Sequence, residues 1–346
     1  MEKSADTLAV NPRIQKWDIL KFTMIFLVVL GHFADYYVDS SVQMKGIFLF
    51  IYTFHMPVFI FVCGLFSKRA VNEKDKGRIF GYLFLYVFLK FFIFLIKVFI
   101  GQKPAISIFT EGGLPWFMLT LSAFIVITIF VKDFSPVYVL SFSVLLACIS
   151  GYDSQIDSFL SLSRIIVFYP FFYLGYISDH KKVEDFCDGK TQKICASIIL
   201  AVFAVVVFCF ADNLYWLRPL ITGVNPFSVL GEQKQNGLII RLIYYIVSGL
   251  VSCSVIVLAP NKCKSDFIVK SGQRTLAVYS FHYVFIYVLY SCFDCKSYFD
   301  RIFGDFSIIV PIVLSVTVTL FLSLKIFSVL LNYIVNPPIK KIKSTE

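Results

Sequence analysis

Long apolar runs recur along this chain from one end to the other, separated by short polar segments. A run of about 20 predominantly apolar residues is the length that an α-helix needs to cross the hydrocarbon core of a bilayer. Only 16% of the residues are charged, whereas a soluble domain carries roughly 25%. The pattern therefore predicts a helical membrane protein and argues against a soluble domain.

The apolar runs predict an all-α, polytopic membrane bundle of about ten transmembrane helices. The expected spans are residues 17–38, 46–66, 79–100, 115–131, 136–150, 163–178, 194–211, 238–259, 272–292 and 307–334. No small-residue cleavage site follows the first run, so we expect a retained helix rather than a signal peptide. No linker or convincing internal repeat divides the chain, and we expect a single transmembrane domain over residues 1–346.

The positive charges are unevenly distributed between alternate connecting segments. With a cytoplasmic N-terminus, the inner segments carry 20 Lys and Arg and the outer segments carry 7. The positive-inside rule then predicts that both termini, the segment 1–16 and the tail 336–346, are cytoplasmic in a multi-pass protein of the cell (plasma or inner) membrane. The net charge of +10 does not indicate a nucleic-acid partner, because such proteins gather their bases on one exposed face.

The nine cysteines do not form the pattern of a disulfide framework. Five lie within apolar runs, where a thiol behaves as a small hydrophobic group: Cys63, Cys148, Cys195, Cys209 and Cys253. Cys292 and Cys295 are close enough in sequence to pair or to bind a metal ion, but no histidine lies beside them.

The first apolar run contains ionisable residues, which are costly in a bilayer and mark function unless they reach the interface. Lys21 and His32 are eleven residues apart, so one helix face carries both at a separation of about 16 Å along the axis. Asp18 precedes Lys21 by three residues and can pair with it. The alternative is that Asp18 and Lys21 only extend to the cytoplasmic surface, which His32 cannot easily do. Asp35 is a fourth ionisable residue of this run.

Three of the four histidines lie at comparable depths in three different runs. His55 lies about nine residues inside the second run and His282 about ten residues inside the ninth, which places both near the level of His32. A shared polar cavity would explain this layer, although single buried histidines are often satisfied core residues. Such a histidine can act as a general base or relay protons in a transporter. His180 lies in a basic cytoplasmic segment, where we expect it to be solvated.

The sequence lacks the motifs of several common classes of enzyme. The sequence has no GxSxG, no GxxxxGK[ST] and no GxGxxG that opens a helix. It also has no HxxxH or HExxH pair, so we expect no metal site.

Five sequence elements occur in an order that resembles the membrane-integral acyltransferases of the acyltransferase-3 type. They are the Lys21 to His32 spacing, FHMPVFIFVCGLFSKR, PWFMLTL around Trp116, SRIIVFYPFFYLGY and GQRTLAVYSFH. The His-Met-Pro sequence is most similar to the subgroup of fucose 4-O-acetylases and exopolysaccharide acyl- or succinyltransferases. Two residues depart from the usual pattern: Cys63 replaces a small residue, and Lys21 replaces an Arg and so lacks its planar fork. The hydrolase-like domain of some members is absent, and we expect the membrane domain to act alone.

The resemblance implies an acyl-CoA-dependent O-acyltransferase. The acyl donor would be cytoplasmic acetyl-CoA or succinyl-CoA, with no permanently bound cofactor, and the acceptor would be a sugar hydroxyl of a cell-surface or exported polysaccharide or its precursor. The expected partners are therefore acyl-CoA, a saccharide and the lipid bilayer. His32 would act as general base, or less favourably form a transient acyl-imidazole, and Lys21, held by Asp18, would orient the donor.

The resemblance also implies residues that bind the donor at the cytoplasmic surface and residues that bind the thioester or the acceptor farther toward the outside. Lys21, Lys68 and Arg69 would bind the phosphates of CoA, although the positive-inside rule alone accounts for Lys68. The residues expected to bind the thioester or the acceptor are His55, Trp116, Arg164, Tyr279 and His282. Trp116 could instead be an interfacial aromatic residue, and Arg164 could simply anchor its helix. The outer segment 212–237 is long enough to shape the way in for the acceptor.

Two other classes of function share some of these features. A transporter of a small solute or lipid-linked sugar would also use intramembrane His and Lys residues, but it is expected to show inverted repeats or broken helix pairs. A structural partner protein would tolerate substitution of His32 and Lys21.

Overall fold

The computed structural model describes residues 14–105, 107–110, 113–223 and 226–335. The predicted tail 336–346 and most of the segment 1–16 lie outside these residues. The longer helices are α1 (Gln15–Asp35), α2 (Val42–Leu65), α4 (Lys76–Phe99), α5 (Trp116–Val131), α6 (Pro136–Ser150), α7 (Leu162–Ile177), α9 (Lys190–Cys209), α12 (Gly237–Leu258), α14 (Thr275–Cys292), α16 (Ile309–Leu322) and α17 (Lys325–Val335). Shorter helices connect them: α3 (Lys68–Asn72), α8 (His180–Asp188), α10 (Ala211–Leu214), η1 (Tyr215–Leu217), α11 (Arg218–Thr222), η2 (Phe227–Asn236), α13 (Asp266–Gly272), α15 (Cys295–Phe303) and η3 (Gly304–Ile308). The described residues form no strand beyond an isolated bridge between Thr110 and Phe159, which confirms the all-α class.

Six helices in the described part of the chain are long and apolar enough to cross a membrane, or seven if one bent pair counts as a span. Helices α5, α6 and α7 have 16, 15 and 16 residues, so each rises about 24 Å or less, short of the ~30 Å hydrocarbon core. A multi-pass membrane protein is thus supported, while ten spans remain a prediction.

The run predicted as one span over residues 307–334 is bent. Phe306–Leu322 and Lys325–Val335 meet at an angle of 61°. At the bend, the Ser323 hydroxyl donates to the Thr319 carbonyl at 2.7 Å, and the Arg274 guanidinium donates to the Ser323 carbonyl at 3.3 Å. The Ser323 amide also donates to the Thr319 carbonyl, at 3.1 Å, so the helical bonding continues up to Ser323, and the Arg274 guanidinium caps the Ser323 carbonyl where α16 ends.

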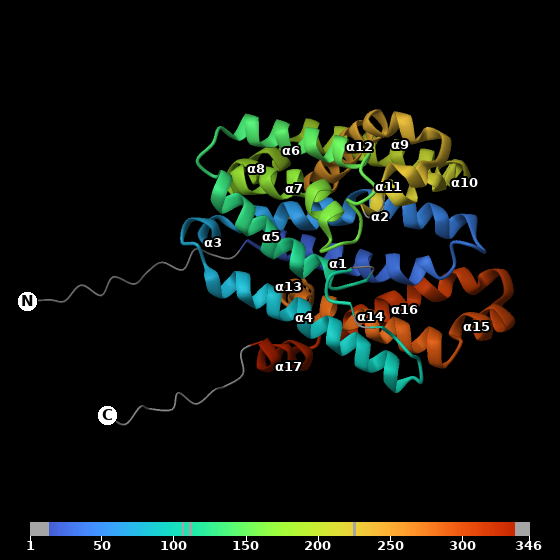
Figure 1. Ribbon diagram of the computed structural model, residues 1–346. Coiled ribbons are helices and arrows are strands. Elements are labelled where there is room, and N and C mark those ends of the chain that lie inside the picture. Colours follow the sequence, from blue (N-terminus) through green and yellow to red (C-terminus); the bar gives the residue numbers. More distant parts are fainter. Residues whose placement is uncertain (1–13, 106, 111–112, 224–225, 336–346) are drawn as a thin grey trace, which may run out of the picture.

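The helices form a bundle with α1 near its centre. Helix α1 contacts α2, α13, α14 and α16, and most of its residues are buried. The connecting helices α3 and α8 lie at one end of the bundle, where α1 begins, and α10 and α15 lie at the other (Figure 1). We call the second of these the α10 end. Helices α4 and α9 lie at the periphery and expose apolar side chains, as expected for faces in contact with lipid.

Two glycines set the distance between α2 and α7. A Cβ at Gly64 would lie 2.0 Å from the Phe172 carbonyl oxygen, and a Cβ at Gly175 would lie 2.1 Å from the Phe61 carbonyl oxygen. Any side chain at either position would therefore force the helices apart. Small residues commonly allow such close packing between membrane helices. Both glycines belong to the sequence elements noted above, so those elements encode helix packing as well as chemistry.

The connection between α4 and α5 turns back into the bundle before α5 begins (Figure 1). The Lys90 ammonium donates to the carbonyls of Ser107 and Thr110, both at 2.6 Å, and the Tyr86 hydroxyl donates to the Ile108 carbonyl at 2.5 Å. Lys90 lies nine residues before the end of α4, which is about 13.5 Å along the helix. Irregular backbone at such depth requires protein donors, and α4 supplies them.

Candidate active site

A cavity of about 350 Å³ lies between α1, α2, α5, α7, α11 and α14. This volume is at the lower end of the range typical of small-molecule sites. Its polar and aromatic lining residues include His32, Asp35, Tyr52, His55, Trp116, Arg164, Arg218, Tyr279 and Tyr283. The chain thus brings residues from distant segments to one polar space inside an otherwise apolar bundle.

Helix α1 contributes one continuous stripe to the wall. Ile25, Val28, His32 and Asp35 line the cavity, and their spacing of three, four and three residues keeps them on one helix face. Lys21 continues the stripe one turn before Ile25, but it lies outside the lining. The predicted alignment of Lys21 with His32 is therefore seen in the helix, with the cavity at the His32 end.

The structure brings His32 and His282 together. Their ring centroids are 5.3 Å apart, and His32 is partly exposed while His282 is fully buried. The Nδ1 of His282 lies 3.0 Å from the Val278 carbonyl and 2.9 Å from the Tyr279 carbonyl. Carbonyls only accept, so Nδ1 carries the proton and the neutral ring has its lone pair at Nε2. That Nε2 has no hydrogen-bond partner among the described residues.

His55 has the same tautomer for the same reason. Its Nδ1 donates to the Ile51 carbonyl at 2.8 Å, which leaves Nε2 as an acceptor, and its ring lies 4.8 Å from that of Tyr52. Because α2 begins at Val42, His55 is deeper in the helix than the sequence suggested. It still lines the same cavity as His32. His32 therefore combines exposure to the cavity with ring nitrogens that no described backbone carbonyl engages.

Arg164 and Trp116 form one unit of the wall. The Arg164 guanidinium lies 4.4 Å from the centre of the Trp116 ring, a cation–π contact. The other side of this wall is Phe168, whose ring stacks with Trp116 at 5.8 Å. Tyr279 lines the cavity, and its hydroxyl donates to the Leu114 carbonyl, so it also holds the chain just before α5.

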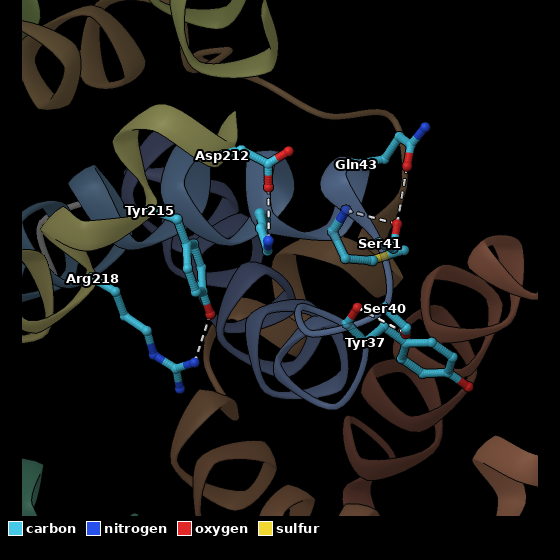
Figure 2. Close-up of polar contacts among 9 residues, drawn as sticks. Tyr37, Ser40, Ser41, Gln43, Asp212, Tyr215 and Arg218 are labelled. Carbon is cyan, nitrogen blue, oxygen red and sulfur yellow. Dashed lines mark hydrogen bonds and ion pairs between the residues drawn. The ribbon is translucent and has the colours of Figure 1, made fainter. Parts of the chain in front are cut away.

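Arg218 lies at the α10 end of the cavity and pairs with Asp35 at 2.6 Å. Figure 2 shows Arg218 bonded to the Tyr215 hydroxyl, at 2.6 Å, with Asp212 on the preceding turn. Burial lowers the pKa of Arg218, but Asp35 and Tyr215 raise it, with a net increase. Asp212 in turn accepts from Lys45 of α2 at 2.7 Å. These contacts hold the segment after α9 against α1 and α2.

The residues predicted to bind the acyl donor lie toward the opposite end. Lys21 pairs with Asp18 at 2.8 Å, and Asp18 also accepts from Gln273 at 3.2 Å. The Asp18 side chain is 3% exposed and that of Lys21 is 24% exposed. Lys68 and Arg69 are exposed on α3, and Arg69 pairs with Glu73 at 3.0 Å. Neither Lys68 nor Arg69 lines the cavity.

Part of this arrangement is predictable from the sequence. The predicted residues that line the cavity are His32, His55, Trp116, Arg164 and Tyr279, and His282 stands behind His32. The structure adds four lining residues for which no role was predicted: Asp35, Tyr52, Arg218 and Tyr283. Asp35 carries a detectable signal, since it is a charged residue within an apolar run. In the described part of the chain, no group of three His, Cys, Asp or Glu side chains is placed to hold a metal ion, and the nine cysteines are free.

Most of the chain is similar to known proteins. The sequence profile of a family described as an acyltransferase domain matches residues 14–329. The chain is 24% identical to nodulation protein NolL of Sinorhizobium fredii over 301 residues, which cover 81% of this chain and 80% of that protein. No solved structure matches significantly. The matched region contains every lining residue of the cavity and the pair formed by Lys21 and Asp18.

Proposed function

This chain belongs to the acyltransferase-3 family of membrane acyltransferases, and on that basis we propose that it transfers an acetyl or succinyl group from acyl-CoA to a sugar hydroxyl. The acceptor is a cell-surface or exported polysaccharide or its precursor. The observation that carries this proposal is the position of His32, which faces a polar cavity at one end of a helix stripe whose other end holds Lys21.

The proposed orientation follows from the distribution of positive charges. Both termini are cytoplasmic, about ten helices cross the cell membrane, and the α10 end faces outward. Acyl-CoA binds at the Lys21 end, and the roughly 16 Å between Lys21 and His32 matches an extended pantetheine arm. The saccharide reaches the cavity past Asp35 and Arg218.

The proposed reaction is direct transfer with His32 as general base. The acceptor hydroxyl donates to His32, which takes the proton as the hydroxyl oxygen attacks the thioester carbonyl. The tetrahedral intermediate collapses, the C–S bond breaks, and the proton passes from His32 to the departing CoA thiolate. The products are an O-acyl sugar and free CoA. His282 is a positioning residue, because its unprotonated Nε2 can accept from the N–H of His32.

The walls of the cavity suit a saccharide. The Arg164 guanidinium, stacked on Trp116, lines the cavity and can hydrogen-bond to sugar hydroxyls, while Trp116 adds apolar lining surface. His55 adds an acceptor nitrogen deeper in the cavity. We propose that these three residues orient the hydroxyl that reacts.

Transfer of label tests the proposed function. Membranes that contain the full chain are incubated with acetyl-CoA labelled in the acetyl group, and in parallel with labelled succinyl-CoA, and the host saccharide precursors are analysed for alkali-labile label. We expect the label to appear on saccharide only when the protein and one of the two donors are present. Saccharide that crosses the membrane unmodified, without any requirement for acyl-CoA, would instead indicate a transporter.

Replacement of Lys21 with Gln is expected to weaken donor binding. The loss of one charge–phosphate contact raises KM for acyl-CoA about tenfold and changes kcat less, whereas Lys21→Arg keeps the charge and stays near the native value. Initial rates in membranes at varied acyl-CoA give both constants. Lys262→Gln, an exposed change outside the stripe, is the control, and an equal KM for Lys21→Gln and the native protein would remove Lys21 from the donor site.

A further inference from the structure

The short helix α11 separates two cavities. Arg218, Ile221 and Thr222 line the candidate active-site cavity. Leu220 and Ile221 line a second, mostly apolar cavity of about 550 Å³ between α2, α9, α11 and α12. Close packing on all sides normally fixes an element in a protein interior, but two sides of α11 border cavities. The position of α11 therefore depends strongly on its polar contacts.

Two of these contacts hold α11 at its ends. At the start of the helix, Arg218 pairs with Asp35 of α1 at 2.6 Å. Directly after the end of the helix, the Ser163 hydroxyl of α7 donates to the Gly223 carbonyl at 2.8 Å. Both contacts connect α11 to helices that line the candidate active-site cavity.

The carbonyl side of α11 is also held by Arg241 of α12, which is 1% exposed. The Arg241 guanidinium donates to the Leu220 carbonyl at 2.8 Å, one of the last four carbonyls of α11, for which a helix needs donors from outside. The rings of Phe227 and Tyr244 have their centres 5.5 and 5.9 Å from the guanidinium, and they limit the directions in which it can point. The fold thus aims a buried guanidinium at one carbonyl of α11.

The burial of Arg241 is costly. A charged residue in a membrane helix is functional by default unless its side chain reaches the interface. Arg241 lies four residues after the start of α12, but its side chain is buried and bonds to protein. It does not line the candidate active-site cavity. Any effect of Arg241 on that cavity must therefore pass through the elements that it contacts, and α11 is the one that lines the cavity.

We propose that Arg241 is a positioning residue for the acceptor: through the Leu220 carbonyl it fixes α11 and, with it, the acceptor side of the cavity. This inference rests on the proposed function, in which the saccharide enters past Arg218 and acyl-CoA binds at the Lys21 end. Without the bond from Arg241, α11 can shift between the two cavities. The shift disturbs contacts with the saccharide and leaves the donor end intact, so KM for the acceptor rises while KM for the donor does not.

Initial rates at varied amounts of saccharide precursor and of acyl-CoA, in membranes that contain the full chain, test this proposal. Arg241→Met removes every donor and is expected to raise KM for the saccharide about tenfold, the loss of one hydrogen bond from a charged group. Arg241→Lys keeps a charged donor and should recover most of the native value. Arg241→Gln, which keeps a neutral donor, replaces Arg241→Met if that variant does not accumulate. The control is Arg301→Met, an exposed change on α15.

A second measurement follows α11 without acyl transfer. In the full chain with Thr222→Cys, alkylation at position 222 by N-ethylmaleimide is timed by peptide mass spectrometry, which separates this site from the nine native cysteines. Thr222 is partly buried. We expect Arg241→Met to raise the alkylation rate severalfold, because the segment opens more often, and Arg241→Lys to leave the rate near that of the parent.

Each outcome decides the question. A selective rise in KM for the saccharide, together with faster alkylation, supports the proposal. The proposal is overturned if Arg241→Met matches Arg301→Met in both KM values, if both KM values rise together, or if the alkylation rate does not change. Arg241-dependent alkylation in a protein that transfers no acyl group would keep the role of Arg241 in holding α11 and remove the proposed function.

Discussion

Replacement of His32 with alanine is expected to lower the rate of acyl transfer by about 10²- to 10⁴-fold, the contribution typical of a general base. His32 is the histidine of the cavity whose ring nitrogens are not engaged by described backbone carbonyls, whereas His55 and His282 each use Nδ1 within their own helix. The measurement is the initial rate of label transfer from acyl-CoA to saccharide in membranes with matched amounts of protein.

The matched control is His180→Ala. His180 lies at the start of α8, outside the cavity, and its loss should leave the rate near the native value. Transfer at the native rate by His32→Ala would show that His32 is structural and that another group removes the proton. If the His32→Ala variant hydrolysed acyl-CoA without transferring the acyl group to saccharide, the role of His32 would be to position the acceptor instead.

Replacement of Gly64 or Gly175 with alanine is expected to lower the free energy of unfolding by about 3 kcal/mol, at the upper end of overpacking costs. In each case the new Cβ would lie about 2 Å from a carbonyl oxygen of the facing helix, a backbone atom that cannot move without shifting α2 against α7. These helices carry His55 and Arg164, so the shift also distorts the cavity. The thermal midpoint of the detergent-solubilised protein, followed by size-exclusion chromatography, reports the loss.

Gly249→Ala provides the control for this effect. Gly249 also lies within a long helix, α12, and a Cβ there would meet no atom within 4 Å. Alanine has the higher helix propensity, so this variant should be as stable as the native protein or slightly more stable. Equal thermal midpoints for Gly64→Ala, Gly249→Ala and the native protein would contradict the tight crossing of α2 and α7.

The helices were predictable because the signal for them is local. Each predicted apolar run contains a helix. An apolar segment in a bilayer must form its backbone hydrogen bonds within itself, and composition alone identifies such a segment. The break after α16 was not predictable, because it involves Arg274, which comes from a distant part of the chain. The return of the segment before α5 likewise depends on Lys90, a donor that only the packed bundle places beside it.

Residues of the site were predictable from the sequence where an ionisable side chain lies among apolar residues. His32, His55 and His282 stand out because ionisable groups are rare in apolar runs, although their shared cavity is a property of the folded chain. Lys90 carries the same signal in the run 79–100. Arg218 lies in a polar connection, where a charge is ordinary, so only its contact with Asp35 reveals its position.

The apolar part of the α1 stripe has an electrical consequence. In the proposed orientation, Ile25 and Val28, with Met56 and Phe59 of α2, form an apolar layer of the cavity lining around the path of the pantetheine arm. This layer lies within the roughly 16 Å between Lys21 and His32, about half of a hydrocarbon core. The membrane voltage then falls over about half the usual distance, and the local field is about twice that of the neighbouring bilayer. The charged phosphates of CoA remain on the cytoplasmic side of this field, while an acetyl group, which is neutral, crosses it without electrical work.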